Sequence, residues 1–431
     1  MQILNPDYDT TTQIFLEKKS SFTITEKASA NTKETPDSKS AGLIEDNVTI
    51  SEEGLNAQSM GPLWKTNSPG PSIPALPDPV AHKTSNGNTF TFETVQNENN
   101  ENSLFLTVTT KDGKEARFSV DTDIMISEDE NGELSINYFR GEGTNSNDIV
   151  VSFASNDQNE KRLNGGDDFV LFLDDTVPSN EPPKSYAEGT QEQIHSIQTG
   201  DGNDTVYVAN NDSGSLDGVY INTGSGDDKV TALTDNKKSQ YDYFTIETGS
   251  GDDKISSGSL QHARVFAGEG NDTLEISSAE NSLINAGAGD DSIYITNATG
   301  SKISAGAGDD SLEFDNIKDI SITTGKGNKN ISVHNIMENV EFDCYGSEVT
   351  FYFQNKLANN VSFLHLSVKT AQTLLKNLDN TNTQVALGAL EDYNINIGLN
   401  LLNPERFEKD VLRSDSVHVS SKRPIKPYMQ S

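Results

Sequence analysis

Six short turns rich in glycine and aspartate contain the residues whose types and spacing could do chemistry. In each turn two glycines are separated by one residue and followed by Asn-Asp or Asp-Asp. The glycines allow a positive φ, so the backbone can curl with its carbonyl oxygens turned into one space, and the final Asp adds a carboxylate. Calcium prefers such oxygen ligands. The predicted metal ligands are Gly200, Gly202, Asn203, Asp204, Gly224, Gly226, Asp227, Asp228, Gly249, Gly251, Asp252, Asp253, Gly268, Gly270, Asn271, Asp272, Gly287, Gly289, Asp290, Asp291, Gly306, Gly308, Asp309 and Asp310.

The turns recur at a nearly fixed spacing. From Gly200 to Gly325 the first glycines are separated by 24, 25, 19, 19, 19 and 19 residues. An internal repeat of about 20 residues is typical of a solenoid. Two short strands fit between successive turns, for example residues 273–277 and 282–286. The sequence therefore predicts an all-β fold, a parallel β-helix or β-roll, with the turns along one edge.

Stacked turns would bring their final carboxylates close together. At a strand spacing of ~4.8 Å, two carboxylates repel by about 0.9 kcal/mol in water and about 3.5 kcal/mol at an effective dielectric of 20. A divalent ion between each pair reverses this, so we expect folding to be coupled to calcium, with about five ions for six turns. A seventh turn has Lys329 in place of the final Asp, and we expect the ammonium groups of Lys326 and Lys329 to end the ion column by replacing an ion.

A simpler interpretation is that these glycines and aspartates only form tight turns, which both residue types favour. A plain turn would also accept Ser or Asn at the final position, but Asp occupies it in all six copies. This favours calcium binding over the turn interpretation.

The turns resemble the RTX, or haemolysin-type, calcium-binding repeat of secreted bacterial proteins, Gly-Gly-x-Gly-x-Asp followed by an aliphatic residue. The resemblance covers residues 199–331 and implies a parallel β-roll, calcium ions between coils and folding after export. Two features depart from the family pattern. Thr or Ala replaces the first glycine, as at Thr199 and Ala267, and there is one copy per coil. We therefore expect one ion column along a single edge.

Three further regions flank the repeats. Residues 1–87 are rich in Ser, Thr and Pro, and we expect them to be disordered. Residues 88–198 alternate with period two and predict a β-rich region that could include early, degenerate coils. Residues 332–431 predict terminal coils, a capping helix near 368–378 and a basic tail.

Composition narrows the classes of partner. The net charge of −34 argues against nucleic acid and anionic membranes, which need a basic surface. No apolar run is long enough to span a membrane, and the single Cys344 excludes a disulfide framework. The N-terminus lacks the features of a Sec signal, so we expect non-classical or one-step export to the extracellular medium.

Other candidate sites are weaker. The pairs Asp167-Asp168 and Asp174-Asp175 could bind an ion, but solvated acidic loops are the favoured interpretation. The chain has no His-Glu-x-x-His motif, so a zinc protease of that class is not predicted. Three tyrosines could line a glycan-binding face, although ordinary strand positions are favoured: Tyr207, Tyr220 and Tyr294.

The leading functional hypothesis is a secreted, non-enzymatic calcium-binding solenoid that is structural, adhesive or an exported factor. Its partners would be calcium and a secretion apparatus, cell surface or glycan. One alternative is a polysaccharide-active β-helix enzyme of the uronate epimerase or lyase type, an idea that rests on fold analogy. Another is a toxin or effector in which residues 1–198 carry the activity.

Overall fold

The structure, a computed structural model, describes residues 73–97 except 77, 101–155, 160–175, 195–210, 215–233, 240–353 and 361–370 except 368, with the backbone of three short strands at 48–49, 385–387 and 397–399. Within these ranges every named element is a β-strand. No helix in the described part is long and apolar enough to cross a membrane. The helix predicted near 368–378 lies mostly outside the described residues.

The strands have the following bounds in chain order. They are β1 (Val48–Thr49), β2 (Val80–Lys83), β3 (Thr89–Gln96), β4 (Asn102–Thr109), β5 (Glu115–Val120), β6 (Ile124–Glu128), β7 (Leu134–Tyr138), β8 (Asn147–Phe153), β9 (Glu160–Arg162), β10 (Phe169–Leu173), β11 (His195–Asp201), β12 (Thr205–Ala209), β13 (Ser215–Asp217), β14 (Val219–Ser225), β15 (Lys229–Leu233), β16 (Gln240–Asp242), β17 (Thr245–Ser250), β18 (Lys254–Gln261), β19 (Arg264–Glu269), β20 (Thr273–Glu280), β21 (Leu283–Ala288), β22 (Ser292–Thr299), β23 (Lys302–Ala307), β24 (Asp310–Thr323), β25 (Gly327–Asp343), β26 (Ser347–Phe353), β27 (Val361–Leu364), β28 (Val385–Leu387) and β29 (Ile397–Leu399).

The chain divides into two compact units, which are described separately. Unit 1 is Met1–Leu216 with Asn222–Gly224 and Lys229–Ser239, and unit 2 is Asp217–Ile221, Ser225–Asp228 and Gln240–Ser431. Stacked parallel coils, the mark of a β-solenoid, occur in both units. The predicted fold class is therefore confirmed.

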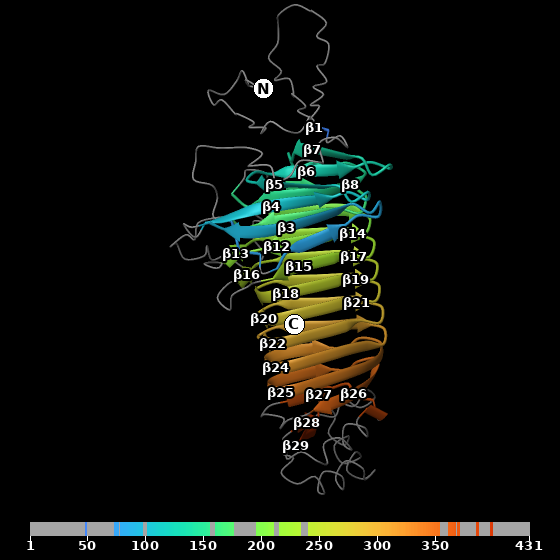
Figure 1. Cartoon of the computed structure of the whole chain (residues 1–431). Helices are drawn as coiled ribbons and strands as arrows, with labels where there is room; N and C mark the ends of the chain where they lie inside the picture. The colour runs from blue at the N-terminus through green and yellow to red at the C-terminus, as the bar shows by residue number, and fades with distance from the viewer. Residues whose placement is uncertain are drawn as a thin grey trace, which may run out of the picture. The chain divides into compact units, whose positions relative to one another are not determined.

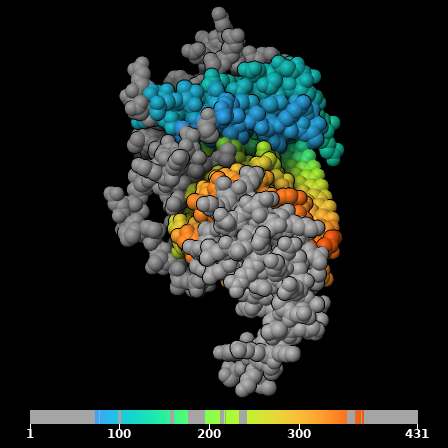
Figure 2. Space-filling model, turned by 90° about the horizontal axis from the view of Figure 1, so that it is seen from below, coloured from blue at the N-terminus to red at the C-terminus, as the bar shows by residue number. Residues whose placement is uncertain are grey.

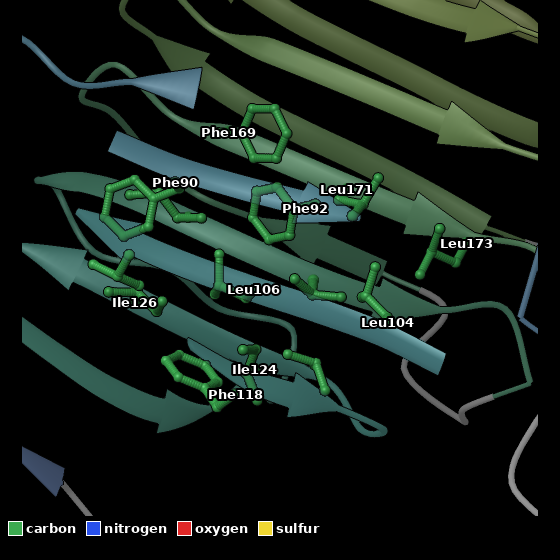
Figure 3. Packing of buried hydrophobic residues seen from close by; sticks show 14 of the residues in the cluster. Phe90, Phe92, Leu104, Leu106, Phe118, Ile124, Ile126, Phe169, Leu171 and Leu173 are labelled. Atoms are coloured by element: carbon green, nitrogen blue, oxygen red, sulfur yellow. The ribbon is translucent and has the colours of Figure 1, made fainter. Parts of the chain in front are cut away.

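Unit 1 begins with an antiparallel four-stranded sheet in the order β2-β3-β4-β5. Its alternating pattern turns Phe90, Phe92 and Leu106 into a shared apolar core. Figure 3 shows these side chains facing Phe169 and Leu171 of β10. In the space-filling view of Figure 2, the strands of this sheet form a continuous blue-to-cyan layer at the surface.

The coils of unit 1 begin before the glycine repeats. Strand β10 pairs in parallel with β8 on one side and β12 on the other, and β9 pairs in parallel with β11. Strands β8, β9 and β10, which precede the glycine repeats, therefore belong to stacked parallel coils. Ordered structure also starts earlier than residue 88, because β2 is a strand and Ile73 and Leu76 are buried.

Unit 2 contains the regular coils, drawn as successive rungs from β18 to β25 in Figure 1. One face is built by β18, β20, β22 and β24, which pair in parallel with a shift of one repeat, so that Leu274 lies opposite Ile255 and Ile293. A second face is built by β17, β19, β21 and β23 in the same way. Inward aliphatic side chains alternate with outward polar ones on both faces.

The two edges of each coil in unit 2 differ. Between β16 and β17, between β18 and β19, and in the equivalent place of the later coils, one residue adopts a left-handed conformation. These residues are Tyr243, His262, Asn281, Gly300, Asp319 and Asn339, with φ between 49° and 64°. The opposite edge carries the glycine-aspartate turns, so the predicted one-sided placement of the turns is correct.

Candidate functional site: the aspartate edge

The glycine turns stack directly on one another and form what we call the aspartate edge. Gly249, Gly268, Gly287 and Gly306 are successive partners in the parallel register. The packing requires glycine: at Gly289 φ is 136°, and an added Cβ would lie 1.9 Å from the carbonyl oxygen of Gly270. The glycines therefore permit backbones to approach so closely that carbonyl oxygens of one turn face the next.

The final aspartates of the turns point inward and form an inner ladder. In unit 2 the Oδ1 of every member after Asp228 accepts a hydrogen bond from the backbone N–H of the final Asp one turn earlier, at 2.8–3.0 Å. The members are Asp228, Asp253, Asp272, Asp291 and Asp310, all at most 2% exposed. This ladder brings the predicted carboxylates together in one buried row.

The second carboxylate oxygen, Oδ2, takes no part in the hydrogen bonds of the inner ladder. Oδ2 of Asp272 and of Asp291 is buried and has no hydrogen-bond partner among the described residues. Burial, aided by neighbouring carboxylates, raises the pKa of Asp272 to about 6 and that of Asp291 to about 7. A buried carboxylate without a partner is costly in its ionised form. The row would therefore be stabilised by a cation or by protons.

At the end of the row the chain supplies a cation itself. Lys329 lies opposite Asp310 in the register, in the place of a final Asp. Its Nζ lies 2.7 Å from Oδ2 of Asp310, with both side chains fully buried. The same ammonium donates hydrogen bonds to the carbonyl oxygens of Gly308 and Lys326, the latter at 2.7 Å. Three oxygens thus surround one positive charge.

The same backbone arrangement repeats along unit 2. Gly308 N–H donates to the carbonyl of Lys326 at 2.9 Å, as Gly289 N–H does to that of Ala307 at 2.8 Å. Because the turns superimpose in register, each inner Asp has the carbonyls that correspond to those around Lys329 Nζ. Among the described residues no three His, Cys, Asp or Glu side chains gather as a metal site. A cation here would therefore depend on backbone carbonyls.

The preceding residue of each turn points outward and forms a separate outer ladder. Its Oδ1 accepts the N–H of the equivalent residue one turn later, at 2.7–2.9 Å in unit 2. The amide oxygen of Asn271 accepts this hydrogen bond in the same way as the carboxylate oxygens of Asp252 and Asp290. The side chains are exposed. Of the predicted ligands, Asn203, Asp227, Asp252, Asn271, Asp290 and Asp309 thus belong to an exposed hydrogen-bonded row rather than to the buried one.

Comparison with known proteins assigns this chain to no family. The chain matches no protein-family model, no curated protein and no solved structure. The chemistry of the site is therefore argued from its own atoms. Buried carboxylates and carbonyls in a row can bind hard cations.

Several sequence predictions about individual side chains need correction. Asp168, Asp174 and Asp175 are buried, so their acidic pairs are not solvated loops. The side chain of Lys326 is exposed; only its carbonyl reaches the site, because its residue points away from the inner row. Of the two lysines, only Lys329 brings its ammonium group into the inner row.

Unit 1 contains an inner and an outer row of the same kind, which the glycine spacing did not reveal. Asp148 N–H donates to Asp168, and Asp168 N–H donates to Asp204, each to Oδ1 at 2.8 Å. Asn147 and Asp167 continue the outer ladder toward Asn203. The Asp-Asp and Asn-Asp pairs before β8 and β10 were the signal that could have found them. The tyrosines at 207, 220 and 294 are strand residues of β12, β14 and β22.

Proposed function

We propose that the protein is a calcium-binding β-solenoid whose successive coils are joined by ions at the aspartate edge. The observation that carries this proposal is the ammonium of Lys329, which pairs with Asp310 and two carbonyl oxygens where the repeat would otherwise continue. A positive charge is thus built into the last position of the row. The preceding positions have the same oxygens and no lysine in register.

The chemistry of the ligands favours calcium among common ions. All the inward groups are oxygens, and calcium takes about 6–8 oxygen ligands from carboxylates, carbonyls and water. Zinc would prefer His or Cys, whereas the members of the inner ladder are all aspartates and the described residues hold no group of three His, Cys, Asp or Glu side chains. With one ion per pair of successive turns, the six intact turns would hold about five ions.

Binding of this kind makes calcium a folding switch. Repulsion accumulates along the ladder without ions, and each site adds about 2.7 kcal/mol of stability when calcium is at 100 times its dissociation constant. Extracellular calcium-binding modules work at about 10⁻⁴–10⁻³ M. We therefore place the protein outside the cell, as a structural or adhesive component or an exported factor.

The direct experiment is a thermal melt of the full chain in EGTA and in ~5 mM calcium, followed by circular dichroism. We expect a clearly higher midpoint with calcium. Asp291→Asn keeps the Oδ1 acceptor but removes the charge, so calcium should raise its midpoint less. Glu280→Gln is the matched control, because Glu280 is exposed on the same coil and away from the edge. Superimposable curves with and without calcium would reject the proposal.

The alternative functions remain hypotheses. The described residues offer no observation that favours a uronate-active enzyme or a toxin over a calcium-binding solenoid. A calcium-dependent midpoint together with no turnover of uronate polymers would favour the proposal over the enzyme.

A further inference from the structure

Asp168 of unit 1 stands outside the glycine repeats and yet belongs to a row of hydrogen-bonded aspartates like the inner ladder of unit 2. It precedes β10, whose parallel pairing with β8 and β12 makes residues 165–173 part of a regular coil. Its side chain is fully buried. Oδ1 accepts the N–H of Asp148, and its own N–H donates to Asp204, both at 2.8 Å. Asp168 is therefore held by the same pair of hydrogen bonds as the inner aspartates of unit 2.

The second carboxylate oxygen of Asp168, Oδ2, takes no part in these hydrogen bonds. Oδ2 is buried and has no hydrogen-bond partner within the described ranges. Burial, then the nearby carboxylates of Asp204, Asp148 and Asp167, raises the pKa of Asp168 to about 10. A positive charge beside Oδ2 would therefore stabilise the ionised form of this carboxylate.

The surroundings of Asp168 match those of Asp310, where Lys329 supplies the charge. Gly166 N–H donates to the carbonyl of Asp201 at 2.9 Å, just as Gly308 N–H donates to that of Lys326 at 2.9 Å. The stacking distance agrees as well. A Cβ added to Gly202 would lie 1.9 Å from the carbonyl oxygen of Gly166.

The same addition at Gly327 would place a Cβ 2.1 Å from the carbonyl oxygen of Gly308. The carbonyls of Gly166 and Asp201 therefore correspond to the two that accept hydrogen bonds from Lys329. The residue of unit 1 at the position of Lys329 is Asp204, which brings a negative charge instead.

We propose that Asp168 Oδ2 and the carbonyl oxygens of Gly166 and Asp201 bind a further divalent cation of the calcium class. This site lies outside the glycine repeats and rests on the proposed function, because it uses the same chemistry. The ladder needs no cation beyond it. Asp148, the next member, accepts hydrogen bonds from Thr144 N–H to Oδ2 at 2.6 Å and from Thr144 Oγ1 to Oδ1 at 3.1 Å.

The competing explanation is a permanently protonated Asp168, and isosteric replacement separates the two. Calcium bound per full-length chain is counted by equilibrium dialysis and elemental analysis. Asp168→Asn mimics the protonated acid and keeps the Oδ1 acceptor. The cation site predicts one ion fewer than wild type. Asp167→Asn, which removes the neighbouring outward charge, should bind the wild-type number. An unchanged count in Asp168→Asn would overturn the proposal.

A second pair of variants tests the site without altering Asp168. In Asp204→Lys the new ammonium should reach Asp168 as Lys329 reaches Asp310, whereas Asp204→Asn removes the same charge and adds none. We expect Asp204→Lys to bind one ion fewer than Asp204→Asn, and equal counts would contradict the site. If Asp291→Asn loses an ion and the Asp168 variants do not, only this inference fails. If wild type binds no calcium, the proposed function fails with it.

Discussion

Lys329 Nζ and Asp310 Oδ2 lie 2.7 Å apart in a fully buried ion pair at the end of the inner ladder. The lysine occupies the register position that a final aspartate holds in the preceding turns. The chain therefore changes the sign of one residue at the point where the repeat stops. This relationship links the repeat in the sequence to the charge that the row of aspartates requires.

Replacing Lys329 by Met should leave the Asp310 carboxylate buried and uncompensated. Loss of one partner of a buried ion pair typically costs about 3–5 kcal/mol. We expect a loss of unfolding free energy of that order in EGTA, measured by urea denaturation. Lys326→Met is the control, because that side chain is exposed and only its carbonyl contacts the site. Equal losses in the two variants would mean that the buried pair is not what stabilises the last turn.

Replacing Lys329 by Asp should extend the ion row instead of breaking it. The variant restores the pattern of the intact turns, and the ammonium that fills the last position is gone. We expect it to be less stable than wild type in EGTA and to recover much of this loss in calcium. The number of calcium ions bound per chain should rise by one. A count that stays at the wild-type value would show that the lysine does not stand in for an ion.

The second glycine of each turn should tolerate no side chain. In Gly289→Ala the new Cβ would meet the carbonyl oxygen of Gly270 at 1.9 Å, in addition to the strain of a positive φ. Gly113→Ala is a matched comparison, because φ there is 79° and nothing lies within 4 Å of the added atom. We expect Gly113→Ala to cost about 1–2 kcal/mol, as expected for a left-handed residue, and Gly289→Ala distinctly more. Thermal melts of both variants in calcium would decide this.

The fold could be predicted because its signal is periodic. Equal steps of 19 residues between glycines require equal coils, and the aliphatic residue two places after each final Asp marks an inward position. The orientation of the two paired residues in each turn was harder to predict from the sequence. In the strand-like path beyond the turn, neighbouring side chains point to opposite sides, so Asp291 is buried while Asp290 is exposed. The residue types alone made both equally good ligands.

Asp148 and Asp168 escaped prediction as members of such a row for a related reason. Asp168 and Asp204 are 36 residues apart in sequence although they are hydrogen-bonded neighbours. A search for repeats at a constant spacing in the sequence does not detect such a pair. The two lysines of the seventh turn posed the same difficulty, since the sequence does not say which of Lys326 and Lys329 points inward.

Acid should remove the stability that one buried histidine of unit 1, His195, contributes while it is neutral. Burial, then the charge of Lys161, lowers the pKa of His195 from 6.5 to about 4. The unfolded chain therefore binds the extra proton first, and the contribution of His195 to stability falls as pH drops from about 6.5 toward 4. At pH 5 the loss is about 2 kcal/mol relative to pH 8. The variant His195→Gln lacks this group. Between pH 8 and pH 5, its free energy of unfolding, measured by urea denaturation, should therefore change by about 2 kcal/mol less in the destabilising direction than that of wild type. Parallel stability curves for the two proteins would contradict the prediction.

The outer ladder should stabilise the protein equally with and without calcium. Asn271 Oδ1 accepts the N–H of Asp290 at 2.8 Å, and Asn271 N–H donates to Asp252 at 2.7 Å. Asn271→Ala removes the first bond and should cost about 0.5–1.5 kcal/mol, the usual net value of one hydrogen bond. Asn271→Asp keeps the acceptor and should cost less. Because the side chain is exposed, the difference between the two variants should be the same in EGTA and in calcium. If Asn271→Ala instead abolished most of the stabilisation by calcium, the outer residues would be ligands and the assignment of the ions to the inner row would be wrong.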